Sequence, residues 1–135
     1  MEEYLRLKYY PEVPEVLKRI KGRKKAIFSN GALDMLKSLV QFAGLNILFD
    51  DILSTDEVKV YKPDPKAYTV VLEKFNISRE EILFVSSNPW DVAGGKSFGF
   101  HVAWVNRENK TFDKLDQTPD LIIQDLSGLL VFLAG

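Results

Sequence analysis

Short apolar runs alternate with segments of helical periodicity along the chain. Runs rich in β-branched and aromatic residues predict strands at 24–28, 52–54, 82–85, 101–105 and 121–123. Between them, apolar residues spaced three or four apart predict helices at 14–20, 32–42, 65–75, 89–99 and 126–133. The unbroken run at 82–85 predicts a buried strand. This alternation predicts a parallel sheet covered by helices.

Capping residues mark several helix boundaries. Asp64 and Asn88 each precede a proline and are predicted to be N-caps. Ser78 and Glu81 have the spacing of a capping box and predict a one-turn helix. Gly99 predicts the end of the helix that Asn88 begins.

The composition predicts one globular domain over residues 1–135. The chain is 46% hydrophobic and 27% charged, and its net charge of −1 creates no general attraction for nucleic acid or anionic membranes. The chain has no cysteine, which excludes disulfides and thiolate catalysis, and its single histidine, His101, argues against a zinc site. No apolar run is long enough to span a bilayer, so we expect a cytoplasmic protein. The basic run at 18–25 is best explained as a solvated helix end.

Three polar clusters follow predicted strands. They are Ser29 with Asn30, Lys62, and the stretch from Ser86 to Asp91. Ligands of parallel α/β sheets bind beyond the carboxyl ends of the strands. We therefore expect the three clusters to converge on one crevice.

The first two clusters have the chemistry of an anion site. Ser29 and Asn30 combine a hydroxyl and an amide at a helix start, although Asn30 could simply be a helix cap. Lys62 precedes Pro63, which limits where its ammonium can point; it could stabilise an anion or be an ordinary solvent lysine. Tyr68, in the next helix, could add a hydroxyl or simply pack.

The third cluster contains a single acid, Asp91. Magnesium sites normally use more than one carboxylate, and Ser87, four residues earlier, is neutral. Ser86 and Asn88 therefore predict hydrogen bonding around a carboxylate or a water, with no metal and no cofactor. Trp90 could line an apolar pocket, but a core position is more common for tryptophan.

The order and spacing of these clusters resemble the haloacid dehalogenase superfamily, most closely its L-2-haloacid dehalogenases. The matching stretches cover nearly the whole chain and are 27–31, 60–64, 83–91, 98–100, 104–107 and 117–120. Ser86 and Ser87 begin a Ser-Ser-Asn-x-x-Asp motif that is specific to the dehalogenase branch, whereas phosphatases carry Gly-Asp there. The resemblance implies a Rossmann-like parallel sheet with helices on both faces.

The resemblance also implies an activity and roles for the site residues. Family members displace halide from a 2-haloacid with an aspartate, and water then hydrolyses the ester. Ser29 would bind the substrate carboxylate, while Asn30 and Trp90 would cradle the halide. Two residues would contact the nucleophile: Lys62 would pair with it and Ser86 would hydrogen-bond it. Asn88 and Asp91 would orient Lys62 and the water. Tyr68 matches an active-site tyrosine of the family.

The family's nucleophile, on an Asp-x-x-Gly-Thr segment, has no counterpart in these residues. We therefore expect the sequence to be the C-terminal part of a longer chain, without most of the cap domain; Arg6 is the nearest candidate for the cap arginine. The usual first central strand would lie between the strands at 25–28 and 82–85. The flanking strands would close up, or a second copy or a complementing N-terminal segment would supply the strand.

Two other functions stay open. One is a magnesium-dependent phosphatase of the same superfamily, against which Ser87 argues. The other is a non-catalytic remnant that binds small carboxylates or a partner subunit through Ser29, Asn30 and Lys62.

Overall fold

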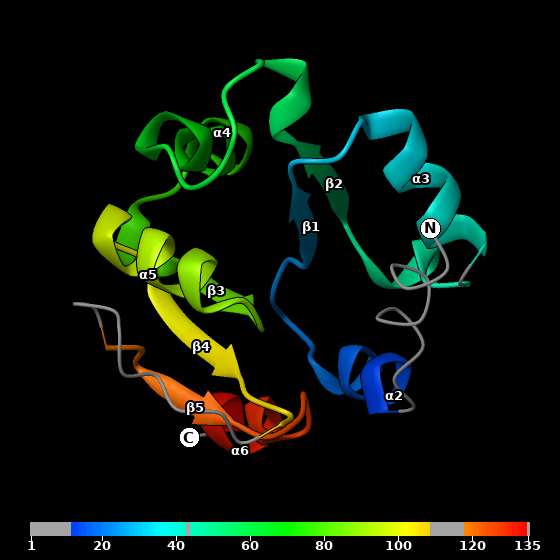
Figure 1. Ribbon diagram of the computed structural model, residues 1–135. Helices are drawn as coiled ribbons and strands as arrows, with labels where there is room; N and C mark the ends of the chain where they lie inside the picture. The colour runs from blue at the N-terminus through cyan, green and yellow to red at the C-terminus, as the bar shows by residue number, and fades with distance from the viewer. Residues whose placement is uncertain (1–11, 43, 109–117, 135) are drawn as a thin grey trace. The chain divides into compact units, whose positions relative to one another are not determined.

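Two units make up the described part of the chain. The computed structural model describes residues 12–42, 44–108 and 118–134. The first unit comprises the described residues up to Glu57 and from Leu126 onward, and the second unit runs from Val58 to Asp125 (Figure 1). The single domain over 1–135 stays a prediction.

The first unit is built on two parallel strands, β1 (Ala26–Ser29) and β2 (Asp51–Ser54). They are joined by α3 (Leu33–Phe42) and the 3-10 helix η1 (Asn46–Leu48), and α3 packs on β2 with Leu36, Leu39 and Val40 buried. A second 3-10 helix, η2 (Thr55–Glu57), follows β2. The helices α2 (Glu12–Arg19) and α6 (Gly128–Ala134) contact each other.

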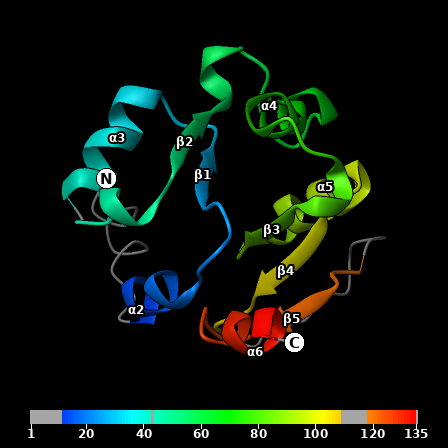
Figure 2. The same cartoon turned by 180° about the vertical axis from the view of Figure 1, so that it is seen from behind.

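The second unit holds a parallel sheet in the order β3 (Leu83–Ser86), β4 (His101–Val105) and β5 (Leu121–Ile123) (Figure 2). The helix α5 (Pro89–Phe98) packs on β3 and β4, and α4 (Pro65–Phe75) packs on α5. The 3-10 helix η3 (Arg79–Glu81) has the predicted capping box. Asp64 caps α4 by accepting from the backbone N–H of Lys66 at 2.9 Å, as predicted.

Four aromatic rings form the core beside α4 and α5. The ring of Tyr68 lies 5.9, 5.6 and 5.8 Å, centroid to centroid, from those of Phe84, Phe98 and Phe100. Two of these contacts are edge-on, a geometry that aromatic pairs favour. The Tyr68 side chain is fully buried and held from several sides, so its hydroxyl has a fixed direction.

The prediction that β3 is buried was wrong except at Phe84. The buried strand is β4, in which Val102 to Val105 are all buried. The reason is position: β4 has a neighbour on each side, whereas β3 is an edge strand of its sheet. β1, which is also an edge strand, is likewise only half-buried along its length. These are the two strands predicted to flank an absent central strand.

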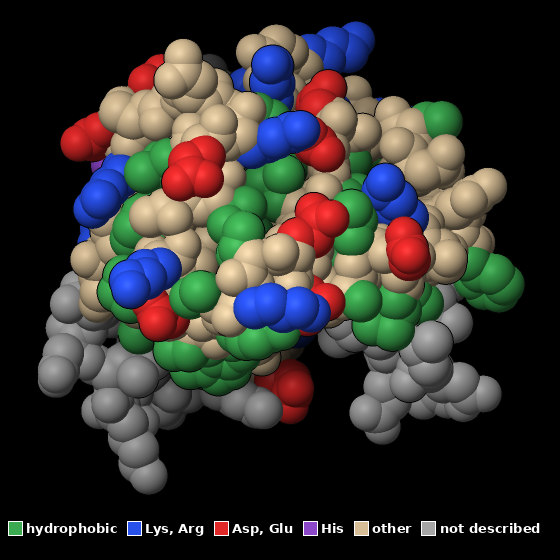
Figure 3. All heavy atoms as spheres, turned by 90° about the horizontal axis from the view of Figure 1, so that it is seen from above, with side chains coloured by type: hydrophobic (Ala, Val, Ile, Leu, Met, Phe, Trp, Pro, Cys, Tyr) green, Lys and Arg blue, Asp and Glu red, His purple; other side chains and the backbone are tan. Residues whose placement is uncertain are grey.

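Charges of both signs are interspersed on the face seen in Figure 3. This distribution agrees with the net charge of −1. Across the described ranges, the structure contains no helix that is both long enough and apolar enough to cross a membrane.

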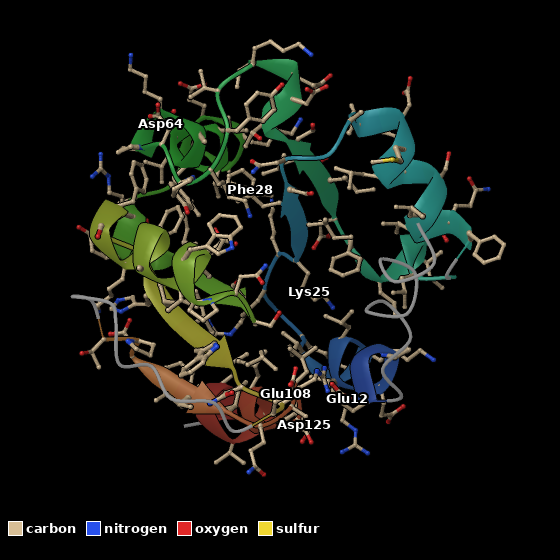
Figure 4. The ribbon with its side chains drawn as sticks, in the orientation of Figure 1. Glu12, Lys25, Phe28, Asp64, Glu108 and Asp125 are labelled. Atoms are coloured by element: carbon tan, nitrogen blue, oxygen red, sulfur yellow. The ribbon has the colours of Figure 1, made fainter. Side chains whose placement is uncertain are left out.

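One lysine of the basic run at 18–25 has a structural role in the first unit. The ammonium of Lys25, labelled in Figure 4, donates to the carbonyls of Leu17 at 2.7 Å and Ile20 at 3.0 Å, at the end of α2. A cation there satisfies carbonyls that lack intrahelical partners. Lys25 therefore differs from the solvated interpretation of the run, because its half-buried ammonium bonds the backbone at the end of α2.

In the second unit, an ion pair joins α5 to the start of β5. The carboxylate of Asp120 accepts from the Lys96 ammonium at 2.7 Å and from the Val102 N–H at 2.8 Å. Burial alone would raise the pKa of Asp120. The hydrogen bonds from Lys96 and Val102 and the charges of Lys96 and His101 lower it by more, so the pKa of Asp120 lies below its usual value.

We expect this ion pair to make stability depend on acid. A carboxyl with a lowered folded-state pKa stabilises the fold above its unfolded pKa, and this contribution is lost as the pH falls through the folded pKa. Asp120→Asn should cost less than about 1 kcal/mol at neutral pH, because the pair is partly exposed. Its free energy of unfolding, measured with urea, should fall less steeply than that of the natural protein below about pH 4. Parallel curves for the two proteins would contradict this.

Candidate functional site

A buried lysine–aspartate pair lies at the centre of the polar site in the second unit. The Lys62 ammonium is 2.9 Å from Oδ2 of Asp91, and the two side chains are only 8% and 6% exposed. Lys62 stands in the loop that Asp64 ends, and Asp91 is in the first turn of α5. The solvent-lysine interpretation of Lys62 was therefore wrong.

Two hydroxyl groups add to this pair. Tyr68, on α4, donates to Oδ1 of Asp91 at 2.9 Å, and Ser86, at the end of β3, donates to Oδ2 at 3.2 Å. The Ser86 hydroxyl in turn accepts from the backbone N–H of Asn88 at 3.2 Å. Three elements thus supply donors to one carboxylate, which fixes the direction of the lysine.

The side chains of Lys62, Tyr68 and Asp91 are buried in this site. Burial, the charge of Asp91 and the hydrogen bond to it all raise the pKa of Tyr68, in that order, so the phenol stays a donor at any physiological pH. The Lys62 ammonium lies 5.4 Å from the centroid of the Phe84 ring, within the range of a cation–π contact. A preorganised cation in such a place can stabilise negative charge that develops nearby.

Ser29 and Asn30 belong to the first unit, at the end of β1. The Ser29 hydroxyl accepts from the Gly31 N–H at 3.1 Å. The Thr55 hydroxyl donates to Oδ1 of Asn30 at 2.7 Å, and the Ser54 hydroxyl donates to the carbonyl of Gly31. These contacts orient the Asn30 amide so that its NH₂ group is turned away from Thr55.

The structure brings together Lys62, Tyr68, Ser86 and Asp91 in one hydrogen-bonded set, with Asn88 attached through its backbone. The convergence of this set with Ser29 and Asn30 stays a prediction, because they belong to the other unit. Arg6 lies outside the described residues.

Two of the plainer interpretations were wrong. Trp90, in the first turn of α5, is 46% exposed and is therefore not a core residue. Asn30 is not the N-cap of α3: the first helical bond runs from the Leu36 N–H to the carbonyl of Ala32, which places the cap at Ala32. Asn88 does occupy the N-cap position of α5, although its side chain makes no capping hydrogen bond.

Sequence reasoning missed three contributors. Ser54 is the last residue of β2 and Thr55 follows it, so the rule about the carboxyl ends of strands applied to them as well. Gly94 was also missed, although a Gly-Gly pair inside a predicted helix is a signal of close packing. Among the described residues, no group of three or more His, Asp or Glu side chains is placed to hold a metal ion.

The fold and this set of polar residues define a class of hydrolase. The family model for haloacid dehalogenase-like hydrolases matches residues 1–99. The chain belongs to this family.

Among the similar proteins of this family are several dehalogenases. The chain is 46% identical to haloacetate dehalogenase H-2 of Moraxella sp. (strain B) and 42% identical to (S)-2-haloacid dehalogenase of Pseudomonas sp. (strain YL), over 98% and 96% of its own length. It covers 60% and 56% of those proteins, so it spans somewhat over half of these relatives. The solved L-2-haloacid dehalogenase of Xanthobacter autotrophicus is 36% identical with a TM-score of 0.86, over 93% of this chain and 61% of that one.

Proposed function

We propose that this chain supplies the cationic and hydrogen-bonding groups of a hydrolytic 2-haloacid dehalogenase site. The observation that carries the proposal is the buried Lys62–Asp91 pair with its donors Tyr68 and Ser86. A buried cation held by several partners is common at sites where charge develops during a reaction. The relatives, which are haloacetate and (S)-2-haloacid dehalogenases, support the same class of reaction.

The proposed reaction has two steps. A carboxylate oxygen attacks C2 of the 2-haloacid, the new C–O bond forms, and the halide leaves with the electron pair of the C–halogen bond. Water then attacks the carbonyl carbon of the ester and loses a proton, which releases the 2-hydroxy acid and restores the carboxylate. The net products are a 2-hydroxy acid, a halide ion and a proton.

The roles of the residues follow from their chemistry. Lys62 would pair with the attacking carboxylate, and Asp91, which holds its ammonium at 2.9 Å, would keep it aimed. Ser86 and Asn88 would complete the hydrogen bonding around the nucleophile and the water. Tyr68 supports Asp91 from the opposite oxygen.

The substrate would contact a second group of residues. Ser29 would bind the substrate carboxylate, while Asn30, through its NH₂ group, and the exposed Trp90 would cradle the departing halide. This assignment is part of the proposal.

The attacking carboxylate is proposed to come from outside these 135 residues. They contain no Asp-x-x-Gly-Thr stretch, and Asp91 already accepts hydrogen bonds on both carboxylate oxygens. A segment bearing the aspartate would also supply a strand next to β1 or β3, which are edge strands of their sheets.

Chloride release from L-2-chloropropionate tests the proposal. We expect the 135-residue chain alone to release no chloride, and the chain mixed with an aspartate-bearing N-terminal segment of a relative to release it. The matched control is the same segment with asparagine in place of its aspartate. Normal turnover by the chain alone would show that the nucleophile lies within it.

Two other outcomes would replace the proposal. Magnesium-dependent hydrolysis of p-nitrophenyl phosphate by the complemented protein, without chloride release, would indicate a phosphatase. Binding of lactate or halide in calorimetry, with neither activity, would indicate a non-catalytic carboxylate-binding protein. Size measurement in solution would then decide whether a second copy is the partner.

A further inference from the structure

Gly94 lies on α5 one helical turn beyond Asp91, on the same face of the helix. A Cβ atom added to Gly94 would lie 2.4 Å from the hydroxyl oxygen of Tyr68 and 3.1 Å from the ring carbon that bears it. No side chain fits at such a distance unless something moves. The phenol therefore occupies the space that any other residue at position 94 would fill.

Tyr68 has little freedom to move aside. It is fully buried and packs against the rings of Phe84, Phe98 and Phe100. Its hydroxyl is also held by the 2.9 Å hydrogen bond to Asp91. A displaced phenol would have to give up that bond or disturb the aromatic core.

Position 94 of α5 also lies close to the loop that carries Lys62. The added Cβ would lie 3.2 Å from Cβ of Pro63, the residue after Lys62. One missing side chain thus lets α5 approach both the phenol and the loop. Glycine in a helix interior is unfavourable relative to alanine, so its presence here needs a packing reason.

We propose that Gly94 is a positioning residue. It leaves the space that the Tyr68 hydroxyl needs to reach Asp91, and it thereby fixes the position of the Asp91 carboxylate that pairs with Lys62. Gly94 touches no reacting atom and acts through Tyr68. The importance of this for dehalogenation rests on the proposed function. The test below measures hydrogen bonding and stability, and it can fail or succeed whether or not the protein releases halide.

The neighbouring Gly95 offers a matched control. A Cβ there would lie 2.6 Å from the ring of Phe84, and no atom of Tyr68 is among its nearest contacts. Gly95→Ala should therefore disturb the aromatic core without removing the space beside the phenol. The two substitutions are chemically identical and stand side by side on one helix.

The test is a rescue by Tyr68→Phe, because phenylalanine lacks the oxygen that the new Cβ would meet. We expect Gly94→Ala to raise the unfolding equilibrium constant about 10- to 100-fold. In a Tyr68→Phe background the same change should raise it less than about 3-fold, while Gly95→Ala should cost about the same in both backgrounds. If Gly94→Ala does not fold, recovery of folded protein in the double variant gives the same answer.

A spectroscopic measurement separates positioning from general damage. The hydroxyl proton of Tyr68 is buried and donated to a carboxylate, so it should exchange slowly and appear in the NMR spectrum, assigned by its loss in Tyr68→Phe. It should disappear in Gly94→Ala and persist in Gly95→Ala. A Gly94→Ala protein that keeps this proton, or one that Tyr68→Phe fails to rescue, would overturn the proposal.

Discussion

Asp91→Asn is expected to lower the free energy of unfolding by about 3–5 kcal/mol, because it leaves the Lys62 ammonium buried without its counter-ion. The side chains of the pair are 8% and 6% exposed, so water cannot readily replace the lost carboxylate. Asparagine keeps nearly the same volume and can still accept from Tyr68 or Ser86. The measured loss would thus report the charge. Urea unfolding at neutral pH gives the value.

The matched control for this change is Asp120→Asn. Asp120 also pairs with a lysine, at 2.7 Å, but those side chains are 29% and 27% exposed, and such pairs contribute less than about 1 kcal/mol. Adding Lys62→Met to Asp91→Asn should recover part of the loss, since no unpaired charge then remains. Equal effects of Asp91→Asn and Asp120→Asn would mean that the site around Lys62 admits water.

A loss of this size is a large share of a typical stability of roughly 5–15 kcal/mol. Well-packed apolar residues would often stabilise a fold as much as a buried ion pair does. Stability alone therefore gives no reason for Lys62 and Asp91. A requirement for a fixed cation, as in the proposed reaction, does give one.

Local signals predicted much of the fold. The helix at 65–75 was predicted with its correct bounds, because Asp64 and Pro65 define its start in any context. The strands at 101–105 and 121–123 were also found as predicted. The 3-10 helices η1 and η2 were not predicted, since single turns carry no apolar period. Burial of β3 was misjudged because it depends on the neighbouring strands, which the residues of the strand itself do not encode.

The sequence predicted which residues form the candidate site better than it predicted the contacts between them. Lys62 and Asp91 were found from residue type and position, whereas only the resemblance implied that Asp91 orients Lys62, because their pairing depends on how the loop before α4 and helix α5 pack. For Tyr68, packing and hydrogen bonding were alternatives in the sequence, whereas the structure has both. Gly94 could not be assigned a role, because the atom it makes room for is 26 positions away along the chain.

Removal of the Lys62 charge is expected to have the largest effect on catalysis. In the chain complemented with an aspartate-bearing segment, Lys62→Met should lower the rate constant of chloride release about 10²–10³-fold, the usual cost of losing one preorganised electrostatic group. The change in KM should be much smaller, since in the proposed site Lys62 pairs with the nucleophile and does not bind the substrate. Steady-state chloride release from L-2-chloropropionate gives both constants.

Two further variants show whether this effect belongs to the position or to the charge alone. Lys66→Met removes an exposed lysine four positions along the chain, in the first turn of α4, and should leave the rate unchanged. Lys62→Arg keeps the charge, but a planar guanidinium cannot replace a compact ammonium at 2.9 Å from Asp91 in this enclosed space, so it should restore only part of the rate. If Lys62→Met and Lys66→Met were equally active, Lys62 would have no role in the reaction, and its pairing with Asp91 would serve the fold alone.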